Sequence, residues 1–195
     1  HENRIRVVLD GVFNHSGRRF FAFEDLLRRG EASGYCSWYS NVRFTGKSPL
    51  GDGFIYEGWN GHYNLVKFNL KNPEVAAFHL RTVSGWIKEL DIDGLRLDAA
   101  DVMDFEFMKN VSEQCRALKP DFWIFGEVVH GDYSRWIRQA GLDSVTNYEM
   151  YKSLYSSFND RNFFELAYSL NREFGAEGIY RNFPLLNFAD NHDVS

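Results

Sequence analysis

Short apolar runs alternate with stretches of helical periodicity along most of this chain. The runs are rich in β-branched and aromatic residues, which predicts about five buried strands. These strands cover residues 4–9, 95–98, 122–125, 142–146 and 183–188. Between them, apolar residues recur at the three- and four-residue spacing of an amphipathic helix. The predicted helices cover residues 76–90, 108–118, 133–140, 148–157 and 161–174.

The first long helix has a start signal at Asn72-Pro73-Glu74. Asn is a favoured N-cap, Pro fits the first turn, and Glu suits the positive end of the helix dipole. Lys119-Pro120 ends the second helix, because proline cannot continue it. Strand and helix therefore alternate, which is typical of an α/β fold with a parallel sheet and crossover helices.

Residues 16–70 interrupt this alternation. They show no sustained period apart from a short helix near residues 23–29, so we interpret them as an irregular inserted subdomain. The part between Tyr35 and Tyr63 combines many aromatic residues with Gly, Ser and Asn. Aromatic rings stack on the apolar faces of sugars, and they can also form the core of a small loop domain. Both roles stay open from the sequence, and both can hold together.

Composition and charge exclude several classes of protein. The 195 residues carry a net charge of −5 and no basic cluster of the kind that a nucleic-acid-binding protein needs. No apolar run is long enough for a transmembrane helix, and no signal peptide is visible. Cys36 and Cys115 form no metal-binding pattern and are expected as reduced thiols, which favours a cytoplasmic location. We therefore expect neither a nucleic-acid partner nor a membrane partner.

The histidines do not indicate a metal site. No two of them have the spacing of a metal-binding pair, so we expect no metal ligands. We expect His62 on a surface loop and His79 on the surface of the first long helix.

Carboxylates follow four of the predicted strands and are the main chemical signal: Asp10, Asp98, Glu127 and Asp193. In a parallel α/β barrel the C-terminal strand ends converge on one mouth, and neighbouring strands lie about 4.8 Å apart. Cleavage of a glycosidic bond needs one protonated carboxyl group for the leaving oxygen and one ionised group that attacks or activates water. The pattern therefore favours paired-carboxylate chemistry.

Neighbouring residues assign these two tasks. Arg96 and Asp98 point to the same face of one strand, so the guanidinium is expected to keep Asp98 ionised, as a nucleophile requires. Glu127 follows the apolar sequence Trp-Ile-Phe-Gly, a setting that suits a protonated general acid. The separation of the two carboxyl groups decides between retaining and inverting chemistry, and the sequence leaves that separation open.

Four short motifs, in order, resemble those of the α-amylase family, glycoside hydrolase family 13. They are DGVFNH at residues 10–15, GLRLD at 94–98, FGEVVH at 125–130 and DNHD at 190–193. The resemblance spans nearly the whole chain. It is strongest to the neopullulanase, cyclomaltodextrinase and maltogenic amylase group, because residues 64–69 and His130 also fit that group.

The resemblance implies a TIM (β/α)₈ barrel, of which this chain would supply about strands 3 to 7. Residues 1–15 and 71–195 would form this partial catalytic barrel, and residues 16–70 would form the inserted domain beside the cleft. The implied activity is the retaining, double-displacement hydrolysis of α-1,4, and in some members α-1,6, glucosidic bonds. The substrates would be maltooligosaccharides, cyclodextrins or related α-glucans.

The resemblance also implies a role for each motif residue. Asp98 would be the nucleophile, Glu127 the acid/base, and Asp193 the carboxylate that stabilises the transition state. The other motif residues would bind the sugar or support its site: Asp10, His15, Arg96, His130 and His192.

Two departures from the family pattern matter. Asp101-Val102 follows the nucleophile where related hydrolases often carry Lys-His or Asn-Glu, which puts the bond preference and the balance of hydrolysis and transfer in doubt. Many α-amylases bind calcium between the Asn of the first motif and an Asp of the inserted domain. Asn14 is present, but Lys67 stands where that Asp would be, and an ammonium group cannot ligate calcium. We therefore expect neither calcium nor another cofactor.

Two alternative functions stay open. A glucanotransferase of the same family shares the covalent intermediate and differs only in its acceptor. A non-catalytic glycan-binding or interaction relative usually lacks catalytic carboxylates, whereas Asp98, Glu127 and Asp193 are all present here. Because a five-strand piece of a barrel has open sheet edges, we expect the isolated chain to be inactive or weakly active and to associate with itself.

Overall fold

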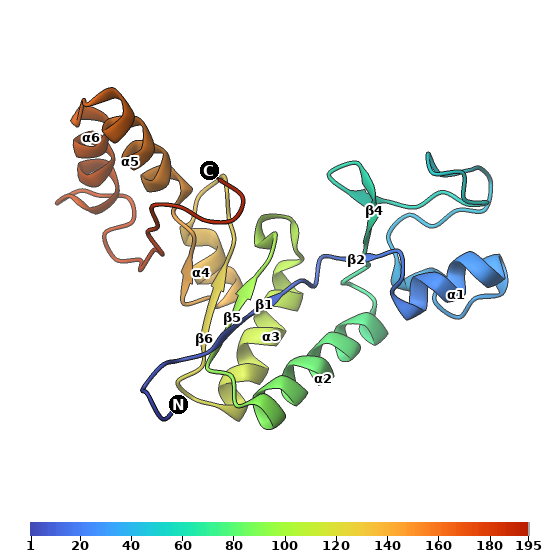
Figure 1. Cartoon of the computed structure of the whole chain (residues 1–195). Coiled ribbons are helices and arrows are strands. Elements are labelled where there is room, and N and C mark those ends of the chain that lie inside the picture. The colour runs from blue at the N-terminus through green and yellow to red at the C-terminus, as the bar shows by residue number, and fades with distance from the viewer. Residues whose placement is uncertain (195) are drawn as a thin grey trace.

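A four-stranded parallel sheet forms the centre of the computed structural model, which describes residues 1–194 (Figure 1). Its strands, in spatial order, are β1 (Val8–Gly11), β5 (Gly94–Leu97), β6 (Trp123–Gly126) and β7 (Ser144–Val145). The register aligns Asp10 with Arg96 and Arg96 with Phe125. The strand order follows the chain order, as expected when each crossover returns to the next position in the sheet.

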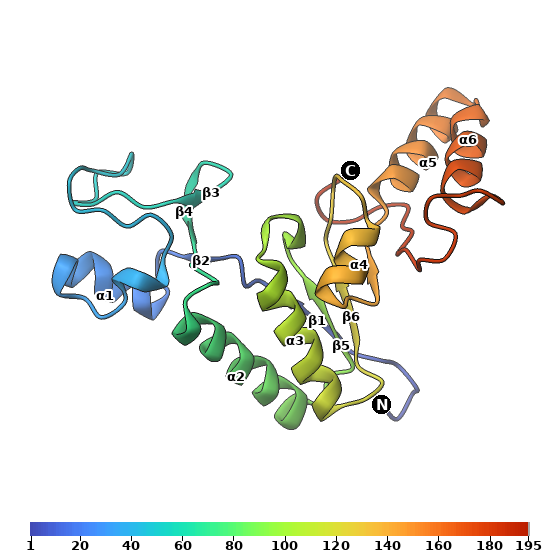
Figure 2. The same cartoon turned by 180° about the vertical axis from the view of Figure 1, so that it is seen from behind.

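Helices cover one face of this sheet and leave the other face open (Figures 1 and 2). The helix α2 (Pro73–Leu90) packs against α3 (Phe105–Leu118), and α3 packs against α4 (Ser134–Ala140). On β5, Leu95 and Leu97 are fully buried, whereas Arg96 between them points to the opposite face. The predicted α/β alternation is therefore confirmed, as an open sheet and not as a closed barrel.

Side-chain caps start three of the helices. Asn72 accepts a hydrogen bond from the backbone N–H of Glu74 at 2.8 Å, so the predicted start of α2 is correct. Asp104 caps α3 in the same way, through the N–H of Phe107 at 3.0 Å. Asn147 caps α5 (Tyr148–Asp160), which packs against α6 (Phe164–Phe174) and projects with it from the end of the sheet (Figure 1).

The last predicted strand, over residues 183–188, is wrong. These residues make only one isolated parallel bridge, between Thr146 and Leu186. The N–H of Leu186 donates to the carbonyl of Val145, and its carbonyl accepts from Asn147, each at 2.9 Å. Pro184 has no N–H to donate, which limits further pairing on this side. Asp193 consequently lies in a loop and not at the end of a regular strand.

Residues 15–67 contain a second, antiparallel sheet that the periodicity did not predict. Its strands are β2 (His15–Gly17), β4 (His62–Lys67) and β3 (Gly58–Trp59), in that order. A tight turn at Asn60-Gly61, with φ values of 48° and 79°, joins β3 to β4. The helix α1 (Phe21–Arg29) and the single-turn helices η1 (Gly30–Ala32) and η2 (Cys36–Trp38) lie in the same segment. The strands β2 and β3, of three and two residues, are too short to show a period.

Most aromatic residues of this segment form its own core. Phe23 packs edge-on against Tyr39 and Tyr56, with ring centroids 5.1 and 5.0 Å apart, and all three rings are buried. Arg18 ties the surrounding loop through a bidentate ion pair with Asp52, at 2.7 and 2.8 Å. The buried cluster continues into the layer around α2 and α3, so it is one core that spans both sheets.

His79 is buried, and its predicted place on a helix surface is wrong. Its ring lies 5.0 Å from those of Phe13 and Phe68 and 5.9 Å from that of Phe107. Its Nε2 atom has no hydrogen-bond partner among the described residues. His62 is exposed, as expected, but it begins β4 and does not lie in a loop, and Cys115 is a fully buried free thiol. The helical pattern around His79 did not show that Phe13 and Phe68 would cover this position.

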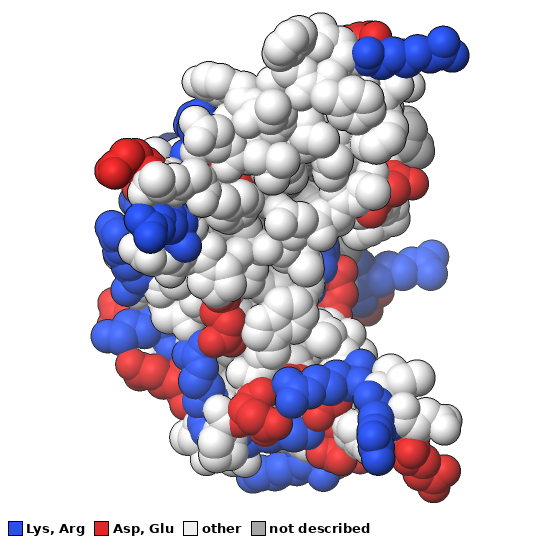
Figure 3. All heavy atoms as spheres, turned by 90° about the vertical axis from the view of Figure 1, so that its left-hand side faces the viewer, with Lys and Arg blue, Asp and Glu red and all other residues white. Residues whose placement is uncertain are grey.

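The far end of the α5–α6 pair carries an exposed apolar patch, which we call the α5–α6 patch. Figure 3 views the molecule from this side, and the upper part of the face shows few charged groups. The patch consists of Tyr155, Phe158, Phe163, Phe164 and Tyr168, each more than half exposed. Within the described residues, no helix combines the length and apolar character needed to cross a membrane.

The burial of His79 predicts an acid-sensitive core. Burial lowers the pKa of His79 from 6.5 to about 4. Between these values the unfolded chain binds a proton that the folded chain does not, so stability falls as the pH drops from 6.5 towards 4. We expect His79→Phe to remove up to about 3 kcal/mol of this pH-dependent loss.

Urea unfolding of the chain at several pH values between 7 and 4 measures this effect. The exposed His62→Phe exchange is the matched control and should leave the pH dependence as in the parent chain. If His79→Phe and the parent chain lose the same free energy of unfolding over this range, the assignment of acid sensitivity to His79 is wrong.

Candidate active site

The ends of β1, β5 and β6 bring three carboxylates to one edge of the parallel sheet. The sheet ladder continues past the strands, because the N–H of Asp98 donates to Gly11 at 3.2 Å and that of Glu127 to Leu97 at 2.9 Å. Side chains alternate along a strand, so Asp98 shares a face with Arg96. Asp10, Asp98 and Glu127 therefore converge where the three strands end.

One guanidinium group contacts all three carboxylates. Nη1 of Arg96 lies 2.7 Å from Asp10 Oδ1 and 3.3 Å from Asp98 Oδ1, and Nη2 lies 3.0 Å from Glu127 Oε1. The side chains of Arg96, Asp98 and Glu127 are 15%, 23% and 13% exposed, so the contacts among these three are shielded from water, whereas the Asp10 side chain is 47% exposed. The adjacent register positions of Asp10 and Arg96 account for the shortest contact.

The charge balance at Asp98 differs from the expectation. The pKa of Asp98 is raised above its usual value, first because the side chain is buried and second because the Glu127 carboxylate lies nearby. Arg96 acts in the opposite direction but does not outweigh these effects. Arg96 thus favours the ionised form of Asp98, as expected from the sequence, but burial and Glu127 have the larger effect on the pKa.

Glu127 lies among polar partners and not in the apolar setting that its flanking residues suggested. Besides Arg96, the hydroxyl of Tyr148 donates to Oε1 at 3.0 Å, and the backbone N–H of Ala99 donates to Oε2 at 3.1 Å. Ala99 has a φ of 50°, in the left-handed region that non-glycine residues seldom occupy. This strained backbone follows Asp98 directly and turns an N–H group towards Glu127.

A cavity of about 420 Å³ lies over this strand edge. Five of the predicted site residues line it: His15, Asp98, Glu127, His192 and Asp193. The cavity is also lined by residues that were not predicted as site residues from the sequence: Trp59, Ala99, Asp101, Val129, Tyr148 and Val194. Asp10 and Arg96 do not line the cavity. Arg96 contacts the lining residues Asp98 and Glu127, and Asp10 contacts Arg96. His130 is exposed and lies outside the cavity lining.

His15 and Trp59 form an aromatic wall of this cavity. Their rings are stacked, with centroids 5.3 Å apart and an interplanar angle of 18°. Burial lowers the pKa of His15, with the Asp98 carboxylate acting in the opposite direction, so His15 is neutral at pH 7. The Asn60-Gly61 turn places Trp59 at the end of the β3–β4 hairpin, and this dipeptide is a hairpin signal that the periodicity did not use.

The last segment adds His192, Asp193 and Val194 to the cavity. His192 Nε2 lies 3.2 Å from Asp193 Oδ2, and both side chains are more than half exposed. The side chain of Asn191 fixes the loop, because its Oδ1 accepts from the N–H of Asp193 at 2.9 Å and its Nδ2 donates to Tyr148 at 3.1 Å. The fourth motif is thereby connected to the third through Tyr148.

Asp101, one of the departures from the family pattern, contributes a further carboxyl group to the cavity. Its pKa is raised by burial and, to a smaller extent, by the Glu127 carboxylate. Val102, the second departure, is 46% exposed and lines a different cavity. The sequence after the nucleophile therefore changes the charge of the cavity wall.

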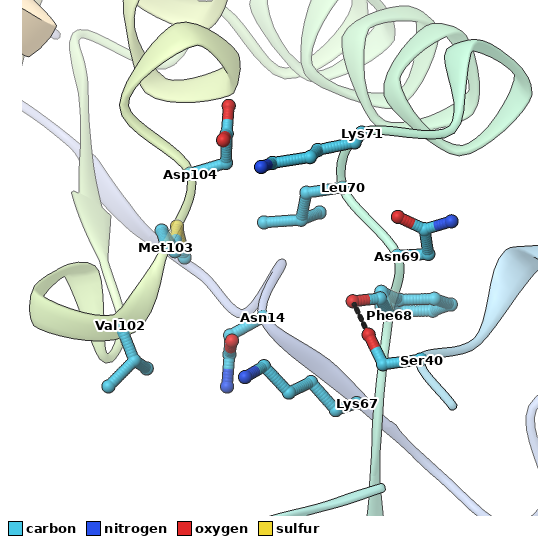
Figure 4. A pocket seen from close by; sticks show the side chains of 10 residues that line it. All are labelled: Asn14, Ser40, Lys67, Phe68, Asn69, Leu70, Lys71, Val102, Met103 and Asp104. Atoms are coloured by element: carbon cyan, nitrogen blue, oxygen red, sulfur yellow. Dashed lines mark hydrogen bonds between the residues drawn. The ribbon is translucent and has the colours of Figure 1, made fainter. Parts of the chain in front are cut away.

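The second cavity lies between Asn14, Lys67 and the start of α3 and has a volume of about 270 Å³ (Figure 4). The ammonium group of Lys67 points towards the Asn14 side chain in this view. Lys67 also forms an ion pair with Glu57, with Nζ 2.7 Å from Oε1. A cationic side chain thus lines the space beside Asn14, and its charge would repel a divalent cation there.

Sequence comparison connects the chain with known enzymes. A model of the alpha-amylase catalytic domain matches residues 1–193. A cyclomaltodextrinase of Thermoanaerobacter pseudethanolicus is 39% identical over 83% of the chain and 28% of the relative. An intracellular maltogenic amylase of Bacillus subtilis is 30% identical over the whole chain and 32% of its own length. The chain thus spans about a third or less of these relatives.

Comparison with solved structures gives the same result. A cyclomaltodextrinase structure superposes with a TM-score of 0.85 at 31% identity, covering 99% of this chain and 33% of the other. A cyclic alpha-maltosyl-(1-->6)-maltose hydrolase from Arthrobacter globiformis gives 0.84 at 27% identity, covering 98% and 43%. These matches confirm the family resemblance found in the four motifs. The chain belongs to the alpha-amylase catalytic-domain family.

Proposed function

We propose that this chain carries the catalytic residues of a retaining glycoside hydrolase that cleaves α-1,4-glucosidic bonds. The observation that carries the proposal is the arrangement of Asp98 and Glu127, which contact one guanidinium group and line one cavity together with Asp193. Two carboxyl groups held close together on adjacent strands fit direct attack by one of them better than attack by an intervening water.

In the first step, Asp98 attacks the anomeric carbon while Glu127 protonates the leaving oxygen. The C–O bond breaks, the alcohol departs with the proton, and a covalent glucosyl-enzyme forms on Asp98. Arg96 offsets the negative charge of the carboxylates around the reacting centre. Asp193 stabilises the positive charge that develops on the sugar.

In the second step, the ionised Glu127 takes a proton from water, and the resulting hydroxide attacks the anomeric carbon. The bond to Asp98 breaks and the carboxylate is regenerated. His15 and His192 bind sugar hydroxyl groups, and Trp59, stacked on His15, offers an apolar face to a pyranose ring. Asp10 forms an ion pair with Arg96 and so holds the guanidinium beside Asp98 and Glu127. His130 binds substrate at the exposed rim of the cavity.

Maltooligosaccharides, cyclodextrins and related α-glucans are the proposed substrates, with α-1,6 bonds as a further target. The names of the relatives support this class: cyclomaltodextrinase, maltogenic alpha-amylase and neopullulanase. A glucanotransferase is the second candidate, because Asp101 adds a carboxyl group beside the acid/base and could hold an acceptor hydroxyl. Free thiols and the similarity to the Bacillus subtilis intracellular enzyme support a cytoplasmic location.

We further propose that the chain represents about strands 3 to 7 of a TIM barrel, with residues 1–15 and 71–195 in the barrel and 16–70 inserted. The open edge of β1 and the single bridge beside β7, at Leu186, support this proposal. In the absence of the remaining strands the cavity has no closing wall, so we expect the isolated chain to be inactive or weakly active.

The two catalytic carboxylates can be distinguished by azide rescue. With Glu127→Ala, azide should attack the covalent intermediate and give the α-glycosyl azide, because the configuration is inverted twice. With Asp98→Ala, azide should replace the nucleophile and give the β-glycosyl azide. Without azide, we expect each variant to lose at least about 10⁴-fold in kcat/KM on maltoheptaose.

Product analysis by NMR, with the protein that contains this chain, checks this assignment. The exposed Glu106→Ala and Asp160→Ala exchanges are the matched controls and should keep full activity. An Asp98 variant that retained normal turnover, or azide products of the opposite configuration, would contradict the assigned roles.

Calcium should not be required for activity. The ammonium group of Lys67 lies beside Asn14 and pairs with Glu57, where a divalent cation would meet electrostatic repulsion. We expect dialysis against EDTA to leave kcat/KM on maltoheptaose unchanged. A loss of activity that added calcium restores would show that a calcium site exists.

The isolated chain should associate with itself. The α5–α6 patch and the open edge of β1 expose apolar and hydrogen-bonding surface that a second copy can cover. Sedimentation velocity of the 195-residue chain should show species larger than a monomer, and Phe158→Ser with Phe164→Ser should reduce them. A strictly monomeric chain that cleaved maltoheptaose at a normal enzymatic rate would contradict both this expectation and that of an inactive fragment.

A further inference from the structure

The hydroxyl group of Tyr148 lies between Glu127 and the loop that carries Asp193. It is 3.0 Å from Glu127 Oε1 and 3.1 Å from Asn191 Nδ2. Burial, together with the Glu127 carboxylate nearby, raises the pKa of Tyr148 to about 12, so the phenol keeps its proton at neutral pH. Tyr148 therefore enters the site as a hydrogen-bond donor.

The direction of these two hydrogen bonds follows from the groups involved. The amide nitrogen of Asn191 can only donate, so the Tyr148 oxygen accepts from it. The phenol has one proton, and it is left to point at Glu127 Oε1. Asn191 consequently determines which way the hydroxyl of Tyr148 turns.

The two oxygens of Glu127 are not equivalent in this arrangement. Oε1 accepts a hydrogen bond from Tyr148 and also lies 3.0 Å from Nη2 of the Arg96 guanidinium, so a proton on this oxygen would face a positive charge. Within residues 1–194, Oε2 accepts from the backbone N–H of Ala99 and from no other donor, which leaves one of its positions free. A proton on the carboxyl group of Glu127 can therefore be held on Oε2 without displacing a donor.

We propose that Tyr148 is a positioning residue: its hydrogen bond to Oε1, beside the charge of Arg96, directs the catalytic proton of Glu127 to Oε2. This inference rests on the proposed function, since it concerns the step in which Glu127 acts as an acid. The proton passes from Oε2 to the glycosidic oxygen as the C–O bond breaks, and the bonding electron pair stays on that oxygen. Tyr148 itself exchanges no proton with the substrate.

The start of α5 holds Tyr148 in this place. Asn147 is fully buried, caps the helix through the N–H of Met150 at 3.0 Å, and donates to Glu173 at 2.6 Å and to Asn187 at 2.9 Å. The Phe188 ring packs edge-on against Tyr148, with centroids 5.0 Å apart. The hydroxyl is thus fixed by contacts on three segments, which a positioning role requires.

The test uses substrates that differ in their need for an acid. Maltoheptaose has a poor leaving group that must be protonated, whereas 2,4-dinitrophenyl α-maltoside has a leaving group that departs without a proton. In the protein that contains this chain, we expect Tyr148→Phe to lower kcat/KM on maltoheptaose between about 10-fold and 100-fold. The value for the dinitrophenyl substrate should stay close to that of the parent protein.

Tyr155→Phe is the matched control, because Tyr155 lies on the same helix and is 58% exposed. It should leave both substrates unaffected. Equal losses of Tyr148→Phe on the two substrates would indicate a merely structural role and would overturn the proposal, as would full activity on maltoheptaose.

A second variant covers the case in which Tyr148→Phe does not fold. Asn191→Asp keeps an oxygen that accepts from the N–H of Asp193 and removes the donor that orients the hydroxyl, so it should cause a loss selective for maltoheptaose, and the double variant should lose no more than Tyr148→Phe. Additive losses would overturn the proposal. If the parent protein cleaved neither substrate, the proposed function itself would be wrong, which is a different outcome from an active parent with an insensitive Tyr148.

Discussion

The ion contacts of Arg96 are the interaction on which the site depends. A single, largely buried guanidinium group lies against Asp10, Asp98 and Glu127, each from a different segment of the chain. Three carboxylates this close would repel one another strongly without a cation between them, and a buried unpaired charge is costly. The positive charge of Arg96 therefore offsets the repulsion among the acidic groups that the ends of β1, β5 and β6 bring together.

The parallel register makes this contact possible. Asp10 and Arg96 are direct neighbours across β1 and β5, and the ladder continues to Asp98 and Glu127. The helix layer buries Leu95 and Leu97, so the alternation of the strand turns Arg96 to the open face. The packing of an apolar core on one face of the sheet thereby orients the charged residues on the other.

The site is completed by segments that lie outside the central sheet. The β3–β4 hairpin brings Trp59 against His15, and the start of α5 brings Tyr148 against Glu127. Both depend on local backbone features: the Asn60-Gly61 turn for Trp59 and the Asn147 cap for Tyr148. The aromatic residues within residues 16–70 have two roles: Tyr39 and Tyr56 belong to the core of this segment, and Trp59 lines the cavity at the strand ends.

The sequence by itself determined the α/β alternation, the start of α2 and the family motifs with Asp98 and Glu127, because these depend on local periodicity and on residues close together in the chain. Only the tertiary structure decided the burial of His79, the bridge that replaces a strand at residues 183–188, and the sharing of Arg96 among three carboxylates. The same holds for Tyr148, whose hydroxyl meets Glu127 across 21 positions of the chain. Burial and electrostatic balance depend on which distant segments meet, and short-range patterns do not contain that information.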